Sequence, residues 1–121
     1  MEKITIYDIL LKVSEKYRIS VEQMKGKERY AEIVKARHIY FYLCRKLTSA
    51  TYYKIAKLLN RDHSTVIHAE NKIADEIYYY RHFEQEINDL IVELQPLKIV
   101  VSDINLLQLS EIYGKKRIKS A

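Results

Sequence analysis

Asn60-Arg61-Asp62-His63-Ser64-Thr65-Val66-Ile67-His68-Ala69 is the stretch that decides the expected fold. An amphipathic segment from Tyr52 to Leu59 precedes it, and a longer helical pattern follows it. The join between them is short, polar and free of Pro, as expected where two helices meet through a tight turn. Behind the polar first turn, Val66, Ile67 and Ala69 can face a core. The stretch therefore predicts a helix-turn-helix.

The second helix of this pair begins with groups suited to DNA. A helix N-terminus carries unbonded N–H groups and a partial positive charge, so it can approach a phosphate closely. Asp62 is the expected N-cap, accepting from the N–H groups of the next turn. His63, Ser64 and Thr65 then occupy the leading turn, where imidazole and hydroxyl groups can reach base edges in a major groove. Arg61 supplies a guanidinium beside them.

Three separated motifs resemble one known family. Residues 60–69, followed by Lys72-Ile73, are similar to the signature of the C-terminal DNA-binding domain (domain IV) of the bacterial replication initiator DnaA. That signature reads roughly Gly-Arg-Asp-His-Thr-Thr-Val-Leu-His-Ala and then Lys-Ile. Upstream, residues 26–29 resemble the family's basic loop, residues 36–38 its next helix, and Leu47-Thr48 the end of that helix. The resemblance implies an all-α fold, a small helical domain with a TrpR-like helix-turn-helix.

The resemblance, which covers roughly residues 5 to 95, also implies roles for side chains. It places Arg29 in a minor groove, where a guanidinium suits a narrow A·T-rich sequence. Lys27 and Arg37 would hold the DNA backbone, or Arg37, next to core Ala36, could make an internal ion pair. Thr48 would bond a phosphate or merely cap its helix. The expected DNA-binding residues are Lys27, Arg29, Arg37, Thr48, Arg61, Asp62, His63, Ser64 and Thr65.

The chain departs from the family pattern at several positions. Ser64 stands where the family usually has Thr, so the hydroxyl is kept and a thymine-methyl contact is lost. Asn60 replaces a Gly at the turn, where Asn accepts a left-handed conformation better than most residues. Glu28 and Ala31 stand where some members carry Arg. Two phosphate anchors are therefore missing, which predicts weaker binding.

Charge and composition bound the protein class. The chain has 121 residues, 48% of them apolar, with only 2 Gly and 1 Pro, which suits one mostly helical domain. Its net charge is +5, and residues 25–72 hold 11 Lys or Arg against 4 Asp or Glu. Residues 73–95 hold 1 against 6. A basic half and an acidic half fit either a face towards a polyanion or an ordinary solvated surface.

The location of the protein follows from other sequence features. No apolar run approaches the ~18 residues that span a bilayer, and no signal-peptide pattern opens the chain. Cys44 is the single Cys, so no internal disulfide can form, and it is expected to be a small buried residue. A reducing, cytoplasmic location without membrane contact is expected.

Helical periodicity places the elements. A capping box at Ser20 to Gln23 opens a short second helix, and Gly26 is the expected hinge of the basic loop. No Gly or Pro marks a break near Arg81-His82, so residues 62–95 form either one helix or two. The other expected helices cover about 5–17, 29–47 and 52–59. We expect a DNA-binding domain over 1–95 and a C-terminal extension over 96–121, where 104–113 could form a last helix.

Catalysis, cofactors and metals are not expected. Asp62, His63 and Ser64 are consecutive on a helix, so they point about 100° apart and cannot form a catalytic relay. His63 and His68 are five residues apart and cannot share a metal as i, i+4 histidines do. His68 is expected to be buried or half-buried and bonded to backbone. With no phosphate-binding loop of the Gly-x-x-x-x-Gly-Lys type, we expect no nucleotide binding and no enzyme.

Two classes of function remain. The favoured one is sequence-specific binding of double-stranded DNA at DnaA-box-like sites by a free-standing chain, in replication initiation or its regulation. The alternative is a protein-interaction or transcription-regulatory module that keeps the helix-turn-helix without reading the DnaA box. Residues 96–121 could bind a protein partner or a second copy. The target site and the oligomeric state are left open.

Overall fold

Six helices and no strand make up the part of the chain that the computed structural model describes, residues 3–95. They are α1 (Ile6–Tyr17), α2 (Val21–Lys25), α3 (Ala31–Leu47), α4 (Tyr52–Leu58), α5 (His63–Tyr79) and α6 (Arg81–Leu94). The expected all-α class and the positions of the first four helices are confirmed. No helix of this part is long and apolar enough to cross a membrane.

Local side-chain hydrogen bonds fix where three helices begin. The Thr5 hydroxyl accepts from the Asp8 N–H while the Asp8 carboxylate accepts from the Thr5 N–H, so α1 opens with a capping box. Ser20 and Gln23 form the expected capping box at α2. At α4 the Thr51 hydroxyl accepts from the Lys54 N–H. These caps satisfy N–H groups that have no partner inside a helix.

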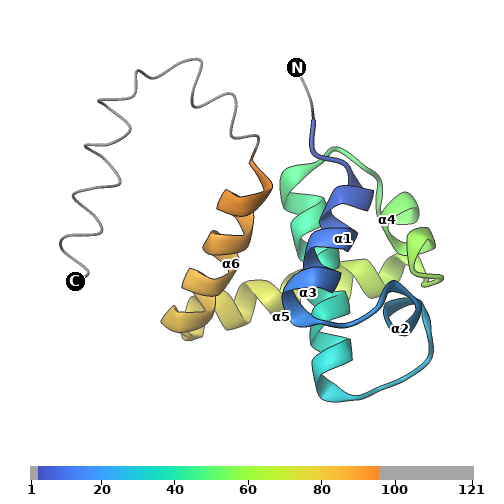
Figure 1. Ribbon diagram of the computed structural model, residues 1–121, viewed down its shortest axis with the longest axis horizontal. Coiled ribbons are helices and arrows are strands. Elements are labelled where there is room, and N and C mark those ends of the chain that lie inside the picture. Colours follow the sequence, from blue (N-terminus) through green and yellow to red (C-terminus); the bar gives the residue numbers. More distant parts are fainter. Residues whose placement is uncertain (1–2, 96–121) are drawn as a thin grey trace.

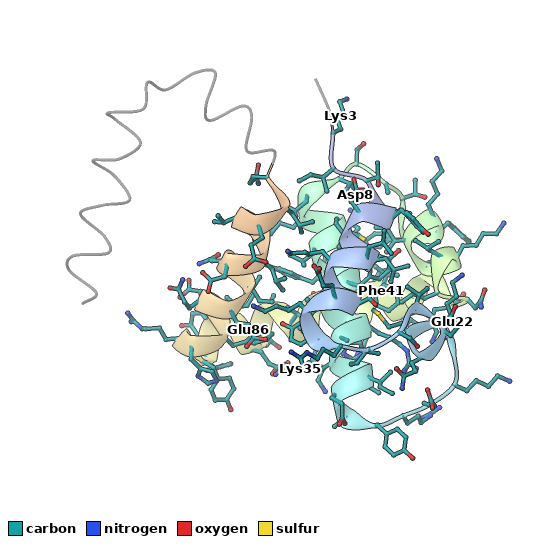
Figure 2. All side chains as sticks on the ribbon, in the orientation of Figure 1. Lys3, Asp8, Glu22, Lys35, Phe41 and Glu86 are labelled. Atoms are coloured by element: carbon teal, nitrogen blue, oxygen red, sulfur yellow. The ribbon has the colours of Figure 1, made fainter. Side chains whose placement is uncertain are left out.

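The helix α3 is the centre of the core. It runs beside α1 and crosses α5, and Figure 1 shows α4 and α6 at opposite ends of α5. Figure 2 labels Phe41 in the interior, where its side chain is fully buried next to Tyr40. The Tyr40 hydroxyl donates to the Ile55 carbonyl oxygen, which ties α3 to α4. Both helices of the helix-turn-helix therefore pack on α3.

The turn between α4 and α5 has the expected geometry. Asn60 has a φ of 57°, in the left-handed region, and the Arg61 N–H donates to the Ala56 carbonyl oxygen. The prediction that Ile67 faces inward is wrong, because its side chain is 39% exposed. Only Val66 and Ala69 of that first stretch are buried, and the buried stripe continues at Ile73. This stripe follows the 3.6-residue period and leaves Ile67 outside it.

Residues 62–95 contain two helices. The break is at Tyr80, whose φ of −124° and ψ of 105° are extended and which caps α5 and α6 alike. After it, α6 returns to α1, where the Tyr17 hydroxyl donates to Glu86, labelled in Figure 2. The amine of Lys12 lies 2.9 Å from a carboxylate oxygen of Glu93. The helix expected at 104–113 lies outside the described residues.

Candidate nucleic-acid interface

The first turn of α5 presents the side chains expected to read bases. Asp62 is the N-cap residue, but the prediction that its carboxylate accepts from backbone N–H groups is wrong. It accepts instead from the Ser64 hydroxyl at 2.6 Å, and this bond, with His63 nearby, holds the pKa of Asp62 below its ordinary value. The hydrogen bond orients Ser64 towards the helix end, so its hydroxyl proton is engaged and its lone pairs remain available.

His63 is held against an aromatic ring of α4. Its imidazole stacks on Tyr53, with ring centroids 4.7 Å apart and an interplanar angle of 24°. Its Nδ1 is buried and makes no hydrogen bond within residues 3–95, and a carboxylate oxygen of Asp62 lies 3.5 Å from it. The side chain is nevertheless 40% exposed. The exposed area therefore lies on the rest of the ring, which includes Nε2.

A basic groove separates the loop after α2 from the start of α5. Most of its charged side chains come from that loop and from the turn before α5. Thr65 of the first turn of α5 reaches the same groove. Its lining residues are Lys25, Lys27, Arg29, Val34, Arg37, His38, Asn60, Arg61 and Thr65. The groove thus joins residues about 35 positions apart in the sequence, and none of its lining residues within 3–95 is acidic.

Arg37 forms the floor of this groove and holds the loop in place. Its side chain is only 5% exposed. Its Nε donates to the Met24 carbonyl oxygen at 2.7 Å, and one terminal nitrogen donates to the carbonyl oxygens of Gln23 and Gly26, each at 3.0 Å. Burial, with Arg61 nearby, lowers the pKa of Arg37. The internal bonds of Arg37 thus go to backbone carbonyls, and no ion pair of Arg37 is seen within residues 3–95.

Arg61 reaches the same loop from the other side. It donates to the carbonyl oxygens of Gly26 at 2.6 Å, Lys25 at 3.1 Å and Leu59 at 2.8 Å. Two guanidinium groups therefore converge on Gly26, at the C-terminal end of α2, where the helix dipole favours positive charge. Gly26 itself has a φ of −76° and a ψ of −173°, an extended conformation that other residues can also adopt, so its role as a hinge stays a prediction. Its Cβ, if present, would lie 3.3 Å from the Glu22 carbonyl oxygen.

Lys27 and Arg29 lie on the rim of the groove. Both are exposed, and neither makes a side-chain hydrogen bond or ion pair within the described part of the chain. Arg29 precedes α3 by two residues, so it projects from the loop and not from a helix. Their charges are thus available to a ligand, in contrast to the occupied guanidinium of Arg37.

Thr48 lies apart from the basic groove. Its hydroxyl donates to the Cys44 carbonyl oxygen at 2.7 Å and accepts from the Ala50 N–H at 3.1 Å. It therefore caps α3, one of the two roles expected for it. It lines a separate depression with Lys46 and Lys54, beside the start of α4.

Sequence reasoning missed several residues near the leading turn of α5. Tyr53, Lys54 and Lys57 line a third depression together with His63. Their spacing on a short amphipathic helix, opposite buried Ile55, was a signal for an exposed basic and aromatic face. His68, expected to be buried or half-buried and bonded to backbone, is exposed instead and meets the ring of His38 edge-on at 6.5 Å. Within residues 3–95, no group of three His, Cys, Asp or Glu side chains could hold a metal ion.

Comparisons with known proteins agree with this geometry. The family described as "Bacterial dnaA protein helix-turn-helix" matches residues 6–73, more than half of the chain. A chromosomal replication initiator protein DnaA from Lachnoclostridium phytofermentans is 37% identical over 97 residues. That match covers 78% of this chain and 21% of the relative, so the chain corresponds to about a fifth of the relative's length.

Proposed function

The chain belongs to the bacterial DnaA helix-turn-helix family, and from that premise we propose that it binds double-stranded DNA sequence-specifically at DnaA-box-like sites. Replication initiation or its regulation is the process that this binding serves. The name of the similar relative, a chromosomal replication initiator, supports that process.

The two sides of the basic groove have different roles in DNA binding. The first turn of α5 enters a major groove, where His63 and Thr65 contact base edges and Ser64, oriented by Asp62, contacts a base or a phosphate. On the other side, Lys27 binds a phosphate and Arg29 enters the neighbouring minor groove. A DNA strand lies between them, over Arg61.

Arg37 and Thr48 act indirectly in this proposal. The polar atoms of both are occupied by backbone groups, so Arg37 holds the basic loop and Thr48 holds the end of α3. The positive charge of Arg37 still attracts a phosphate bound in the groove, because few neighbouring carboxylates screen that charge. The observation that carries the proposal is the groove itself, which brings Lys27, Arg29, Arg61 and Thr65 together.

A binding titration tests the function. Duplexes that contain or lack a DnaA box are compared at two salt concentrations. The box duplex should bind more tightly by at least about tenfold, since each lost base contact removes about 1–3 kcal/mol. The preference should persist at the higher salt, where phosphate contacts weaken on both duplexes. Equal affinities would contradict sequence-specific binding and favour the interaction-module alternative.

Lys27→Ala tests the phosphate contact. Because the Lys27 side chain makes no hydrogen bond or ion pair within residues 3–95, its loss should weaken all duplexes alike and reduce the slope of log affinity against log salt by about one unit. Lys16, an exposed residue of α1 outside the grooves described above, provides the matched control. Lys16→Ala should leave the slope unchanged.

We also propose that residues 1–95 contain the whole DNA-binding unit and that residues 96–121 serve a protein partner or self-association. The family match ends at residue 73 and α6 ends at Leu94, which supports this boundary. A chain shortened to residues 1–95 should keep its DNA affinity within about twofold. A larger loss would place part of the DNA contact in residues 96–121.

A further inference from the structure

Tyr53 is an exposed aromatic residue whose position has no explanation in the core. It lies in the first turn of α4, and 69% of it is exposed. Its hydroxyl makes no hydrogen bond within residues 3–95. The contact that its ring does make is the stack on the imidazole of His63. Burial cannot explain this tyrosine, so its contact with His63 is the feature to be interpreted.

The stack crosses the helix-turn-helix and is positioned by the turn. Asn60, with a left-handed φ, and the bond from the Arg61 N–H to Ala56 fix α4 relative to α5. Ile55, fully buried on the opposite side of α4, holds that helix on the core. Tyr53 therefore presents its ring face from a fixed position, and His63, the first residue of α5, packs against it.

The imidazole has little else to fix its orientation. A histidine side chain rotates about two bonds, and ring orientation is normally set by a hydrogen bond from one nitrogen. In the part of the chain that the structure describes, Nδ1 makes no hydrogen bond, and a carboxylate oxygen of Asp62 lies 3.5 Å from it. The near-parallel ring of Tyr53, at 24°, is the contact that restricts rotation of the imidazole.

We propose that Tyr53 is a positioning residue for base readout, holding the His63 imidazole so that its Nε2 edge faces the bases of a bound duplex. The inference rests on the proposed function and deepens it, because it names the residue that sets the geometry of one base contact. Tyr53 acts through His63, so its effect appears as discrimination between base pairs.

A direct role for Tyr53 would have a different signature. Its ring lies beside Lys54 and Lys57 in the same depression, so a strand that passes there could touch the phenol itself. Such a contact would contribute to affinity whether or not His63 is present. A double-mutant cycle between Tyr53 and His63 separates the two roles.

The binding experiment uses the full chain and four variants: Tyr53→Ala, Tyr53→Phe, His63→Ala and the double alanine variant. Affinities are measured on a DnaA-box duplex and on duplexes with single base-pair changes. Tyr53→Ala should reduce discrimination about twofold to tenfold, at the base pairs where His63→Ala reduces it. Tyr53→Phe keeps the ring and should keep discrimination. The double variant should match His63→Ala.

Additive losses in the double variant, or an equal loss on every duplex, would overturn the inference. If the wild-type chain itself does not discriminate between duplexes, both the proposed function and the inference fall. If the wild type discriminates and Tyr53→Ala leaves that discrimination intact, only the inference falls.

A second measurement on the DNA-free protein tests the stack itself. A ring proton of His63 that lies over the Tyr53 ring has a nuclear magnetic resonance shifted by the aromatic ring current. Tyr53→Ala should remove that shift, and Tyr53→Phe should retain it. Tyr78, 81% exposed at the other end of α5, gives the control Tyr78→Ala, which should leave His63 unaffected. An unchanged His63 resonance in Tyr53→Ala would overturn the inference.

Discussion

Arg37 shows how one buried residue can hold a surface loop in place. Its buried guanidinium donates to three carbonyl oxygens at the end of α2, which closes the loop that carries Lys27 and Arg29. A cation bonded to carbonyls at a helix C-terminus is also favoured by the helix dipole. Replacing Arg37 should therefore disturb the conformation of the loop first, and phosphate binding should weaken as a consequence.

Arg37→Met should consequently destabilise the protein as well as weaken DNA binding. Met is unbranched and fills similar space, but it leaves the carbonyl oxygens of Met24, Gln23 and Gly26 without this donor, and the Met24 carbonyl is buried. We expect a loss of about 1–3 kcal/mol in the free energy of unfolding, measured by urea denaturation. Arg29→Met, at an exposed position, is the control and should not change stability. Weakened DNA binding with unchanged stability would instead make Arg37 a simple phosphate contact.

Replacing His63 or Thr65 should weaken DNA binding with little change in stability, in contrast to replacing Arg37. Both side chains are half-buried in the first turn of α5 and lie outside its buried stripe, so replacing either by Ala should cost less stability than replacing a core residue. Loss of a base contact should lower affinity for a DnaA-box duplex by about 1–3 kcal/mol and relax preference at one or two base pairs. Competition with single-substituted duplexes measures this. Equal losses on box and scrambled duplexes would show that neither side chain reads sequence.

Local hydrogen bonding and backbone preferences were enough to predict the conformation of some residues from the sequence, but not the burial of others. The cap at Ser20 and the left-handed Asn60 follow from side chains that bond or favour their own backbone. The outward positions of Ile67 and His68 do not, because the buried stripe of α5 is selected by where α3 and α4 lie. The sequence offers several apolar stripes, and only packing chooses one.

At the scale of elements, the break between α5 and α6 is a tertiary effect. Neither Gly nor Pro occurs next to Tyr80, so local helix propensity alone would allow one continuous helix over residues 62–95. A continuous helix would carry Phe83 and Ile87, both buried here, away from α1. Bending at Tyr80 buries them, and it brings Glu86 to Tyr17. The apolar surface buried by α6 outweighs the helical hydrogen bonds lost at one residue.

The contact between α3 and α5 should make stability depend on pH. Burial, with Lys72 and His68 nearby, lowers the pKa of half-buried His38 below its ordinary value of 6.5, and Arg37 adds to this while Glu76 opposes it. The unfolded chain therefore binds a proton more readily than the native protein. The stability contribution of His38 is fully present above about pH 6.5 and is lost as the pH falls through the lower native value.

The test is urea denaturation between pH 5 and 8. The wild type should lose stability on acidification below about pH 6.5, and His38→Gln should remove part of that dependence. Gln cannot be protonated in this range, and it keeps a polar side chain beside His68. His82→Gln, at an exposed position on α6, is the matched control. An unchanged pH profile in His38→Gln would show that another group causes the acid sensitivity.

At the scale of the whole molecule, the basic and the acidic elements lie at different ends. The basic loop, α4 and the start of α5 lie together at one end, and the acidic residues of α6 lie at the other (Figure 1). An anionic duplex is therefore attracted to one end and repelled from the other, which orients the protein during encounter. Charge counts along the sequence indicated a basic half and an acidic half, but they left open whether the basic half faces a polyanion. The occupied state of Arg37 and the stack of Tyr53 on His63 depend on contacts between distant elements, which the sequence alone does not fix.

Variants of Arg29 test whether the protein contacts two DNA grooves at once. The rim of the basic groove carries Arg29 on one side and Thr65 of α5 on the other, so a DNA backbone between them would separate a minor groove from a major one. Minor-groove readout distinguishes mainly A·T from G·C, and a narrow A-tract attracts an inserted guanidinium. Arg29→Ala should therefore weaken A·T-flanked sites most, while Arg29→Lys should restore charge without the planar fork.

The measurement is the affinity on paired duplexes that share one DnaA box and differ only in a flanking A·T or G·C run. Because Arg29 is exposed and makes no side-chain hydrogen bond among the described residues, its variants should fold normally, and a thermal melt verifies this for each. Lys27→Ala is the control for charge alone and should weaken both duplexes by the same factor. If Arg29→Ala also weakens both equally, Arg29 contacts only phosphate. The protein would then read DNA through the major groove alone, with the loop after α2 serving as a backbone clamp.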